Sequence, residues 1–197
     1  MEKRTMSVVI LLGTALAYSL AGSTVIPLNF KELSSRAGRI AAGRIERITS
    51  YRDTTTGRIV SKVQMSDVRA LPGAGPAGSL SFEMVGGTLD GVRQWIAGFP
   101  SLEVGDRVVL FLAEDTTTPL GPTVGLWQGV FFVSTDPGSG AEILTNHARR
   151  PIADIRGDEL VFGDGNAGQA ASSKVNLTTF LDRVRAFREM PRTAPAR

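Results

Sequence analysis

The sequence contains no cysteine and only one histidine, His147, among its 197 residues. The absence of cysteine excludes disulfide bonds, thiol nucleophiles and cysteine metal ligands together. A zinc site needs several histidine, cysteine or carboxylate ligands that converge on one point, so a single histidine argues against such a site. We therefore expect no metal site, no cofactor and no catalytic residues in this chain.

A large excess of charge is also missing. The 22 basic and 19 acidic residues give a formal net charge of only +3, although 18 of the basic residues are arginine. A net charge this small does not by itself indicate binding to nucleic acid, and we expect no nucleic-acid partner. The apolar content of 42% is close to the average for globular proteins, so we expect a folded chain.

The N-terminal segment has a basic start followed by a short apolar run. Lys3 and Arg4 precede the apolar residues 8–20, and small residues follow at the end of the run. The run is shorter than the roughly 20 residues that span a membrane as a helix. The pattern predicts a cleaved signal peptide over residues 1–23 and export to the periplasm or the extracellular space. The alternative is an uncleaved signal anchor. After cleavage we expect no stable insertion in a membrane.

Alternating and apolar runs separated by turn residues predict a mainly β fold. Antiparallel strands at this spacing favour a small closed or nearly closed barrel of five to six strands, since closure removes exposed sheet edges. The segments expected to be extended are 40–48, 58–68, 79–85, 92–97, 108–112, 123–133 and 141–145.

The turn at Gly105-Asp106 leads directly into the longest apolar strand. Glycine accepts a positive φ at little cost, so this pair is typical of a tight turn. The run 108–112 consists of five consecutive apolar residues, which indicates a central strand covered on both faces. We therefore interpret Gly105-Asp106 as a structural turn and not as a site.

Helical patterns flank the predicted strands. Phe30 and Leu33 lie one helical turn apart, and Gly38 ends a short N-terminal helix. Residues 151–172 are predicted to form a hairpin followed by a linker. Residues 173–190 form an amphipathic C-terminal helix that packs on the barrel, and residues 191–197 form a disordered tail.

The C-terminal helix carries an apolar stripe and several arginines. Asn176 is a suitable N-cap, because its side chain can accept a hydrogen bond from the first turn. Arg183, Arg185 and Arg188 lie late in the helix, where positive charge suits the helix dipole, and we expect them to be solvated.

A glycine pattern between two predicted strands imitates a nucleotide-binding loop. Gly73, Gly75 and Gly78 match G-x-G-x-x-G. A dinucleotide-binding loop must lead into a helix whose N-terminus holds the pyrophosphate, whereas Pro76 interrupts this pattern and a strand follows it. We interpret the segment as a connection between strands.

Several short motifs follow one another along the chain. They are F-K-E-L-x-x-R-A at 30–37, R-I-A-A-G-R-I at 39–45, Gly86-Gly87, V-G-D-R at 104–107 and G-L-x-Q-G-x-F-x-V at 125–133. In their order these motifs resemble a group of uncharacterised exported bacterial proteins that look OB-like in fold. This resemblance implies an OB-like barrel over residues 24–150 and no established catalytic residues. A looser likeness is to netrin-like protease-inhibitor barrels, whose inhibition of metalloproteases depends on an N-terminal cysteine that this chain lacks.

These observations favour an exported, non-catalytic binding module whose partner is another exported protein. One alternative is a cryptic hydrolase that uses His147, expected in a solvated polar loop, or surface carboxylates such as Asp158-Glu159. A second alternative is a structural component of the cell envelope that binds a glycan or polymer. The sequence leaves the oligomeric state open.

The candidate ligand-binding residues are Tyr51, Arg52, Trp95 and Trp127. Tyr51 and Arg52 begin a long polar loop, and loops of this kind carry function more often than the strands that support them. The two tryptophans are candidates for an aromatic patch, although packing in the core or rim of a barrel is the alternative for Trp127. The candidate loops are 51–57, 72–79 and 116–123.

Overall fold

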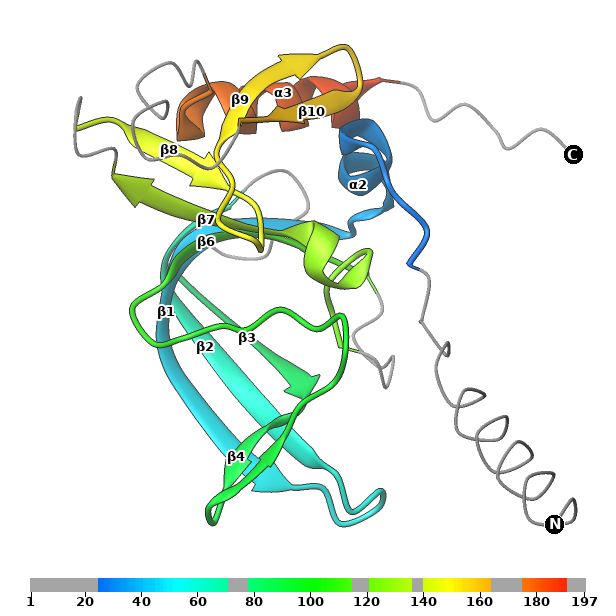
Figure 1. Cartoon of the computed structure of the whole chain (residues 1–197), viewed down its shortest axis with the longest axis vertical. Coiled ribbons are helices and arrows are strands. Elements are labelled where there is room, and N and C mark those ends of the chain that lie inside the picture. Colours follow the sequence, from blue (N-terminus) through cyan, green and yellow to red (C-terminus); the bar gives the residue numbers. More distant parts are fainter. Residues whose placement is uncertain (1–24, 71–77, 115–120, 136–139, 164–174, 191–197) are drawn as a thin grey trace, which may run out of the picture.

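The computed structural model describes residues 25–70, 78–114, 121–135, 140–163 and 175–190 (Figure 1). These residues form a mainly β structure with helices α2 (Phe30–Arg36) and α3 (Leu177–Glu189). None of the described helices has the length and apolar character needed to span a membrane. The predicted signal peptide, most of the predicted linker and the predicted tail lie outside the described residues, as do most of the loops 72–79 and 116–123.

The main sheet has six antiparallel strands in the order β3-β2-β1-β6-β7-β8. Strands β1 to β3 follow one another along the chain, and β6 returns to lie beside β1, which is the order of a Greek key. Two hairpins, β4–β5 and β9–β10, accompany the sheet. The sheet strands are β1 (Arg39–Arg52), β2 (Ile59–Ala70), β3 (Gly78–Val85), β6 (Arg107–Leu112), β7 (Val130–Thr135) and β8 (Glu142–Thr145); the hairpin strands are β4 (Gly87–Leu89), β5 (Val92–Gln94), β9 (Ile152–Arg156) and β10 (Glu159–Phe162).

Strand β1 is the longest strand and belongs to both halves of the molecule. Its first half pairs with β6 from Arg39 to Arg44, and its second half continues with β2 alone. The pairing of β1 with β2 is irregular on both sides of Ile45, and such bulges bend a strand. The bent strand carries β2 and β3 away from the helices in Figure 1.

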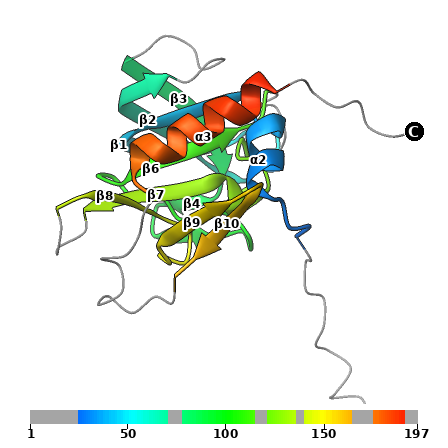
Figure 2. The same cartoon turned by 90° about the horizontal axis from the view of Figure 1, so that it is seen from above.

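One core lies between the sheet and the two helices. Its centre is a cluster of phenylalanine rings, with centroids 4.7 Å apart for Phe30 and Phe180 and 5.1 Å apart for Phe131 and Phe180. Phe30 comes from α2 and Phe180 from α3, so the cluster joins both helices to the sheet. Figure 2 shows α3 lying along this face. The five rings in the cluster belong to Phe30, Phe111, Phe131, Phe180 and Phe187.

The second core lies on the opposite face of the sheet. Successive residues of β6 alternate between the cores, so that Phe111 packs below the helices and Leu110 on the other side. Strand β6 is therefore covered on both faces, as its apolar run predicts. The turn before it is also confirmed: Gly105 has a φ of +97°, and its backbone N–H donates to the Ile45 carbonyl at 2.8 Å.

Both helices begin with side-chain caps, of which the sequence predicted the one at Asn176. Asn29 and Glu32 form a reciprocal capping box at α2, and Asn176 accepts a hydrogen bond from the Thr179 N–H at 2.9 Å. Arg188 corrects the prediction of solvated arginines, because its guanidinium donates to the Ala37 carbonyl oxygen at 2.6 Å. This bond satisfies a carbonyl at the end of α2 and joins the two helices.

The prediction of a closed barrel is not confirmed, because no hydrogen-bonded pair joins β3 to β8 among the described residues. A hollow of about 300 Å³ separates β3 from the end of β6 instead, with Leu80 and Phe82 on one side and Leu112 on the other. The six described strands form a curved, open sheet.

The predicted strand 123–133 is wrong in its first part. Gly125 and Leu126 both have a positive φ, and residues Leu126–Gly129 form a short 3-10 helix, η1. The strand begins only at Val130. The predicted strand 92–97 also ends early, at Gln94, and pairs in the separate hairpin β4–β5.

We expect Phe180→Ala to lower the free energy of unfolding by about 3–5 kcal/mol, because it leaves a cavity among rings that bury Phe180 completely. Urea unfolding followed by far-ultraviolet circular dichroism measures this loss. Val92→Ala is the control, since Val92 is 55% exposed and should change stability by less than about 0.5 kcal/mol. Equal losses in both variants would contradict the assigned core.

Candidate functional site

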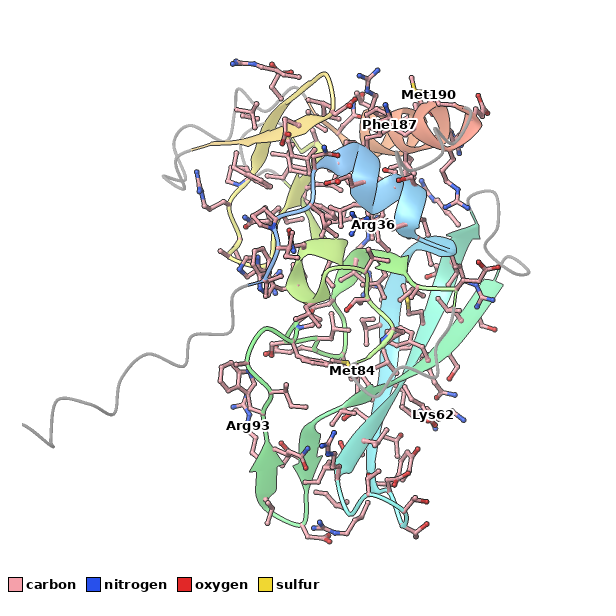
Figure 3. All side chains as sticks on the ribbon, turned by 90° about the vertical axis from the view of Figure 1, so that its right-hand side faces the viewer. Arg36, Lys62, Met84, Arg93, Phe187 and Met190 are labelled. Carbon is pink, nitrogen blue, oxygen red and sulfur yellow. The ribbon has the colours of Figure 1, made fainter. Side chains whose placement is uncertain are left out.

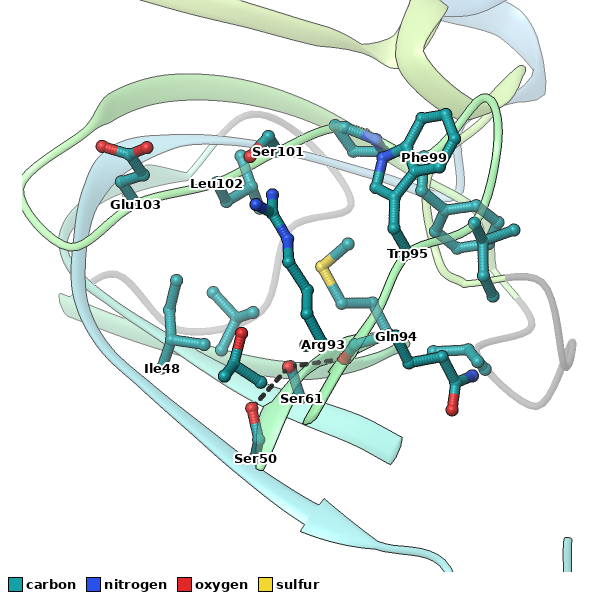
Figure 4. A pocket seen from close by; sticks show the side chains of 18 residues that line it. Ile48, Ser50, Ser61, Arg93, Gln94, Trp95, Phe99, Ser101, Leu102 and Glu103 are labelled. Atoms are coloured by element: carbon teal, nitrogen blue, oxygen red, sulfur yellow. Dashed lines mark hydrogen bonds between the residues drawn. The ribbon is translucent and has the colours of Figure 1, made fainter. Parts of the chain in front are cut away.

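A cavity opens on the inner face of the β1–β2–β3 layer, between the hairpin β4–β5 and the loop 95–103 (Figure 4). Its volume is about 380 Å³, within the range of ligand pockets. Ile48, Val63 and Met84 supply its apolar wall from three adjacent strands. In Figure 3, Met84 points to this inner side while Lys62 points away from it. Successive side chains of these strands alternate as expected, one pointing toward the cavity and the next toward solvent.

A hydrogen-bonded network fixes the hairpin β4–β5 over the sheet. The Ser61 hydroxyl donates to the Gly86 carbonyl at 2.7 Å and lies 3.0 Å from the Ser50 hydroxyl (Figure 4). The Gln94 side chain accepts the Ile59 backbone N–H at 2.9 Å. These bonds satisfy polar groups that the sheet leaves unpaired, so the hairpin forms a fixed wall of the cavity.

Gly87 allows the hairpin to approach the sheet closely. Its φ is +136°, which side chains rarely adopt, and a Cβ atom there would lie 2.2 Å from the Ser61 hydroxyl oxygen. Gly91, at the tip of the same hairpin, also has a positive φ, but a Cβ atom there would meet no atom within 4 Å. Of these two glycines, Gly87 is required by close contact as well as by its positive φ, whereas Gly91 is favoured by its φ alone.

The rim of the cavity combines an aromatic side chain with charges of both signs. Trp95 is 67% exposed although it is a large apolar residue. Arg93 extends across the cavity in Figure 4, and Glu103 lies on the far side of the opening. Neither side chain makes an ion pair with a described residue. An exposed indole beside an unpaired guanidinium can stack on an apolar or planar group and bind an anionic one.

The four predicted ligand-binding residues do not form one site. Trp95 lies at the cavity rim, whereas Tyr51 and Arg52 lie at the far end of β1, outside the cavity lining. Arg52 donates to the Gly57 carbonyl at 2.9 Å and so holds its own turn. Burial, and then the hydrogen bond to Glu83, raise the pKa of the Tyr51 hydroxyl. We therefore assign structural contacts to Arg52 and retain Trp95 as the central residue.

Trp127 contributes to a different and smaller cavity of about 120 Å³ beside α2. It lies in η1, and its ring centroid is 4.1 Å from that of His147. His147 is exposed as a residue, as predicted. Partial burial of its imidazole ring nevertheless lowers the pKa of that ring. Its imidazole nitrogens make no hydrogen bond to a described residue, so no described hydroxyl or carboxylate activates it or is activated by it.

The structure adds Ser61, Arg93, Gln94 and Glu103 to the residues that the sequence indicated. A polar residue on a strand gives no signal of its own, since Ser61 is one of several alternating polar residues in β2. The loop that follows β5 places Glu103 at the same cavity as Arg93, and the sequence alone does not reveal this. Within the described ranges, no group of three or more histidine, aspartate and glutamate side chains is placed to hold a metal ion.

We expect Gly87→Ala to lower the free energy of unfolding by about 3 kcal/mol, because a methyl group would clash with Ser61 and displace the hairpin. The matched control, Gly91→Ala, adds only the strain of a positive φ and should cost about 1 kcal/mol. Urea unfolding of both variants measures the difference. Equal costs would show that the hairpin does not approach the sheet as closely as described.

The single histidine permits a direct test of the Trp127–His147 contact. Because burial lowers the pKa of folded His147, the unfolded chain binds a proton more readily than the folded chain near pH 6. The free energy of unfolding should therefore fall as the pH is lowered through about 6.5. A proton NMR titration should give a pKa below that value, and Trp127→Ala should bring it back toward 6.5. An unchanged pKa in Trp127→Ala would contradict the contact.

Comparisons with known proteins identify no relative of this chain. No family model, no curated protein and no solved structure matches the chain. The resemblance to exported OB-like proteins therefore stays a prediction, and any functional argument depends on the residues described above.

Proposed function

We propose that the chain is an exported, non-catalytic binding module that takes an extended segment of another exported protein into the cavity beside Trp95. The observation that carries the proposal is the combination of a 380 Å³ cavity with an indole that is 67% exposed at its rim. Aromatic side chains of this kind are enriched where proteins bind one another, because one rigid side chain supplies a large contact area.

The sheet edge beside the cavity favours an extended peptide as ligand. Strand β3 pairs only with β2 among the described residues, and Met84 and Val85 of β3 line the cavity. Gly86 donates its N–H to the Ile59 carbonyl, so by alternation the backbone groups of Val85 and Glu83 point away from β2. A strand added at this edge would gain main-chain hydrogen bonds and could place one apolar side chain in the cavity. A carboxylate on the same segment would complement Arg93.

We further propose that the fold is OB-like. The OB fold is a partly open Greek-key barrel that binds ligands on the face of its second and third strands. The order β3-β2-β1-β6, the bend of β1 and the cavity on the β2–β3 face all support this assignment. The fold assignment alone carries no function, because unrelated ligands bind the same architecture.

Two other functions have weaker support. A hydrolase based on His147 would need a hydroxyl and an orienting carboxylate within hydrogen-bond reach, and the described residues offer His147 neither. An envelope component that binds a glycan would also use an exposed indole, and Trp95 is suited to that contact. The open edge of β3 is the feature that favours a peptide over a sugar.

The proposal predicts that the chain without residues 1–23 captures a stoichiometric partner from the exported fraction of its source cells. Trp95→Ala should weaken that partner's binding by about 30-fold, which is the effect of removing a central aromatic residue that contributes about 2 kcal/mol. Mass spectrometry identifies the partner, and surface plasmon resonance measures its affinity for each variant.

Trp127→Ala is the matched control, since it removes the other tryptophan from a different cavity and should leave the affinity unchanged. A partner that binds Trp95→Ala as tightly as the unaltered chain would contradict the assignment of the site. Binding of soluble peptidoglycan fragments that Trp95→Ala abolishes, with no protein captured, would favour the glycan alternative.

A further inference from the structure

A second hollow lies on the other face of the sheet, where β1 bends. Its volume is about 430 Å³, and strands β1, β2 and β6 each contribute an arginine to its lining. These are Arg44, Arg69 and Arg107. None of them lines the cavity beside Trp95, so this hollow is separate from the proposed binding site.

The strand register forces two of these arginines together. Arg44 and Arg107 are direct cross-strand partners on neighbouring strands β1 and β6. Like charges opposite one another destabilise a sheet unless an anion lies between them or beside them. Arg107 has such a partner, since its guanidinium lies 2.5 Å from the Glu142 carboxylate. Arg44 and Arg69 make no ion pair or hydrogen bond with a described residue.

A strained bulge in β2 shapes the hollow. Asp67 has a φ of +52°, and the registers of β2 with β1 and with β3 both skip this residue. Bulges of this kind change the direction of the side chains beside them and are common next to functional sites. Asp67 lines the hollow but forms no salt bridge with Arg44 or Arg69, so the described acid does not neutralise these two cations.

The start of helix α3 adds positive potential to the same place. Leu177, the first residue of α3, lines the hollow, and the first turn of α3 contains no acidic residue. The N-terminal end of a helix carries a partial positive charge that favours anions. Two unpaired guanidinium groups and a helix N-terminus therefore meet at one hollow.

We propose that this hollow binds a small molecule bearing two or more phosphate or carboxylate groups. Arg44 and Arg69 bind its oxyanions through their planar guanidinium groups, which match both anions with paired N–H donors. Asp67 can accept a hydrogen bond from a ligand that also carries a hydroxyl group, as citrate does. The volume suits a molecule larger than a single phosphate ion.

Isothermal titration calorimetry of the purified chain with pyrophosphate and with citrate tests the site. We expect at least one of the two to bind with one-to-one stoichiometry, and the tighter one identifies phosphate or carboxylate as the group that is recognised. Arg44→Gln and Arg69→Gln should each weaken that binding by about tenfold or more, because each removes a hydrogen-bonding charge. Higher sodium chloride concentration should weaken it further.

Arg58→Gln is the matched control, because it removes the same charge from an exposed residue outside the lining of the hollow. Thermal unfolding of each variant verifies that the fold is intact, as expected for exposed arginines without a described partner. If a variant is unstable, two measurements on the unaltered chain take its place. Binding should be lost at high salt, and the NMR signals of Asp67 and Arg69 should shift when the probe is added. The proposal is overturned if neither probe binds at low ionic strength, or if Arg58→Gln weakens binding as much as Arg44→Gln and Arg69→Gln do.

Discussion

The packing of Phe180 against Phe30 and Phe131 is the contact on which the arrangement of the molecule depends. It joins α3, α2 and β7 in one buried cluster, and each of these residues is at most 2% exposed. The helices therefore cover only the half of the sheet that contains β6 and β7. The half that contains β2 and β3 is left free to curve away. The cavity forms on its inner face because the short hairpin β4–β5, and neither of the two described helices, lies over it.

Strand β1 connects these two halves and determines where each candidate site lies. Gly43, at the first of the two bulges, permits the close approach of β2, since a Cβ atom there would lie 2.8 Å from the Ser66 carbonyl oxygen. Beyond this point Ile48 and Ser50 face the cavity, whereas Arg44, directly at the bend, faces the second hollow. The bend thus separates an uncharged inner wall from a basic outer wall on one continuous strand.

Sequence patterns predicted the elements whose determinants are local. The apolar run of β6, the turn at Gly105 and the Asn176 cap depend on neighbouring residues, and each is confirmed. The strand predicted over 123–133 failed because a positive φ at Leu126 leaves no mark in an apolar sequence. Barrel closure, which depends on pairing between distant strands, is not confirmed among the described residues. The same dependence on distant pairing decides which site residues the sequence could predict. Trp95 was predicted because it is an aromatic residue. Strand register alone brings Arg44, Arg69 and Arg107 to one hollow, so the sequence did not predict them.

Both candidate sites contain features that lower the stability of the free chain. Trp95 exposes an indole that burial would stabilise, and Asp67 holds a strained φ. Such features disappear easily by substitution where nothing retains them, because most proteins gain stability readily from surface changes. Binding at the two hollows would explain why these features are retained there. The two faces also differ in chemistry, apolar and mixed in charge around Trp95 but basic around Arg44, so each favours a different ligand.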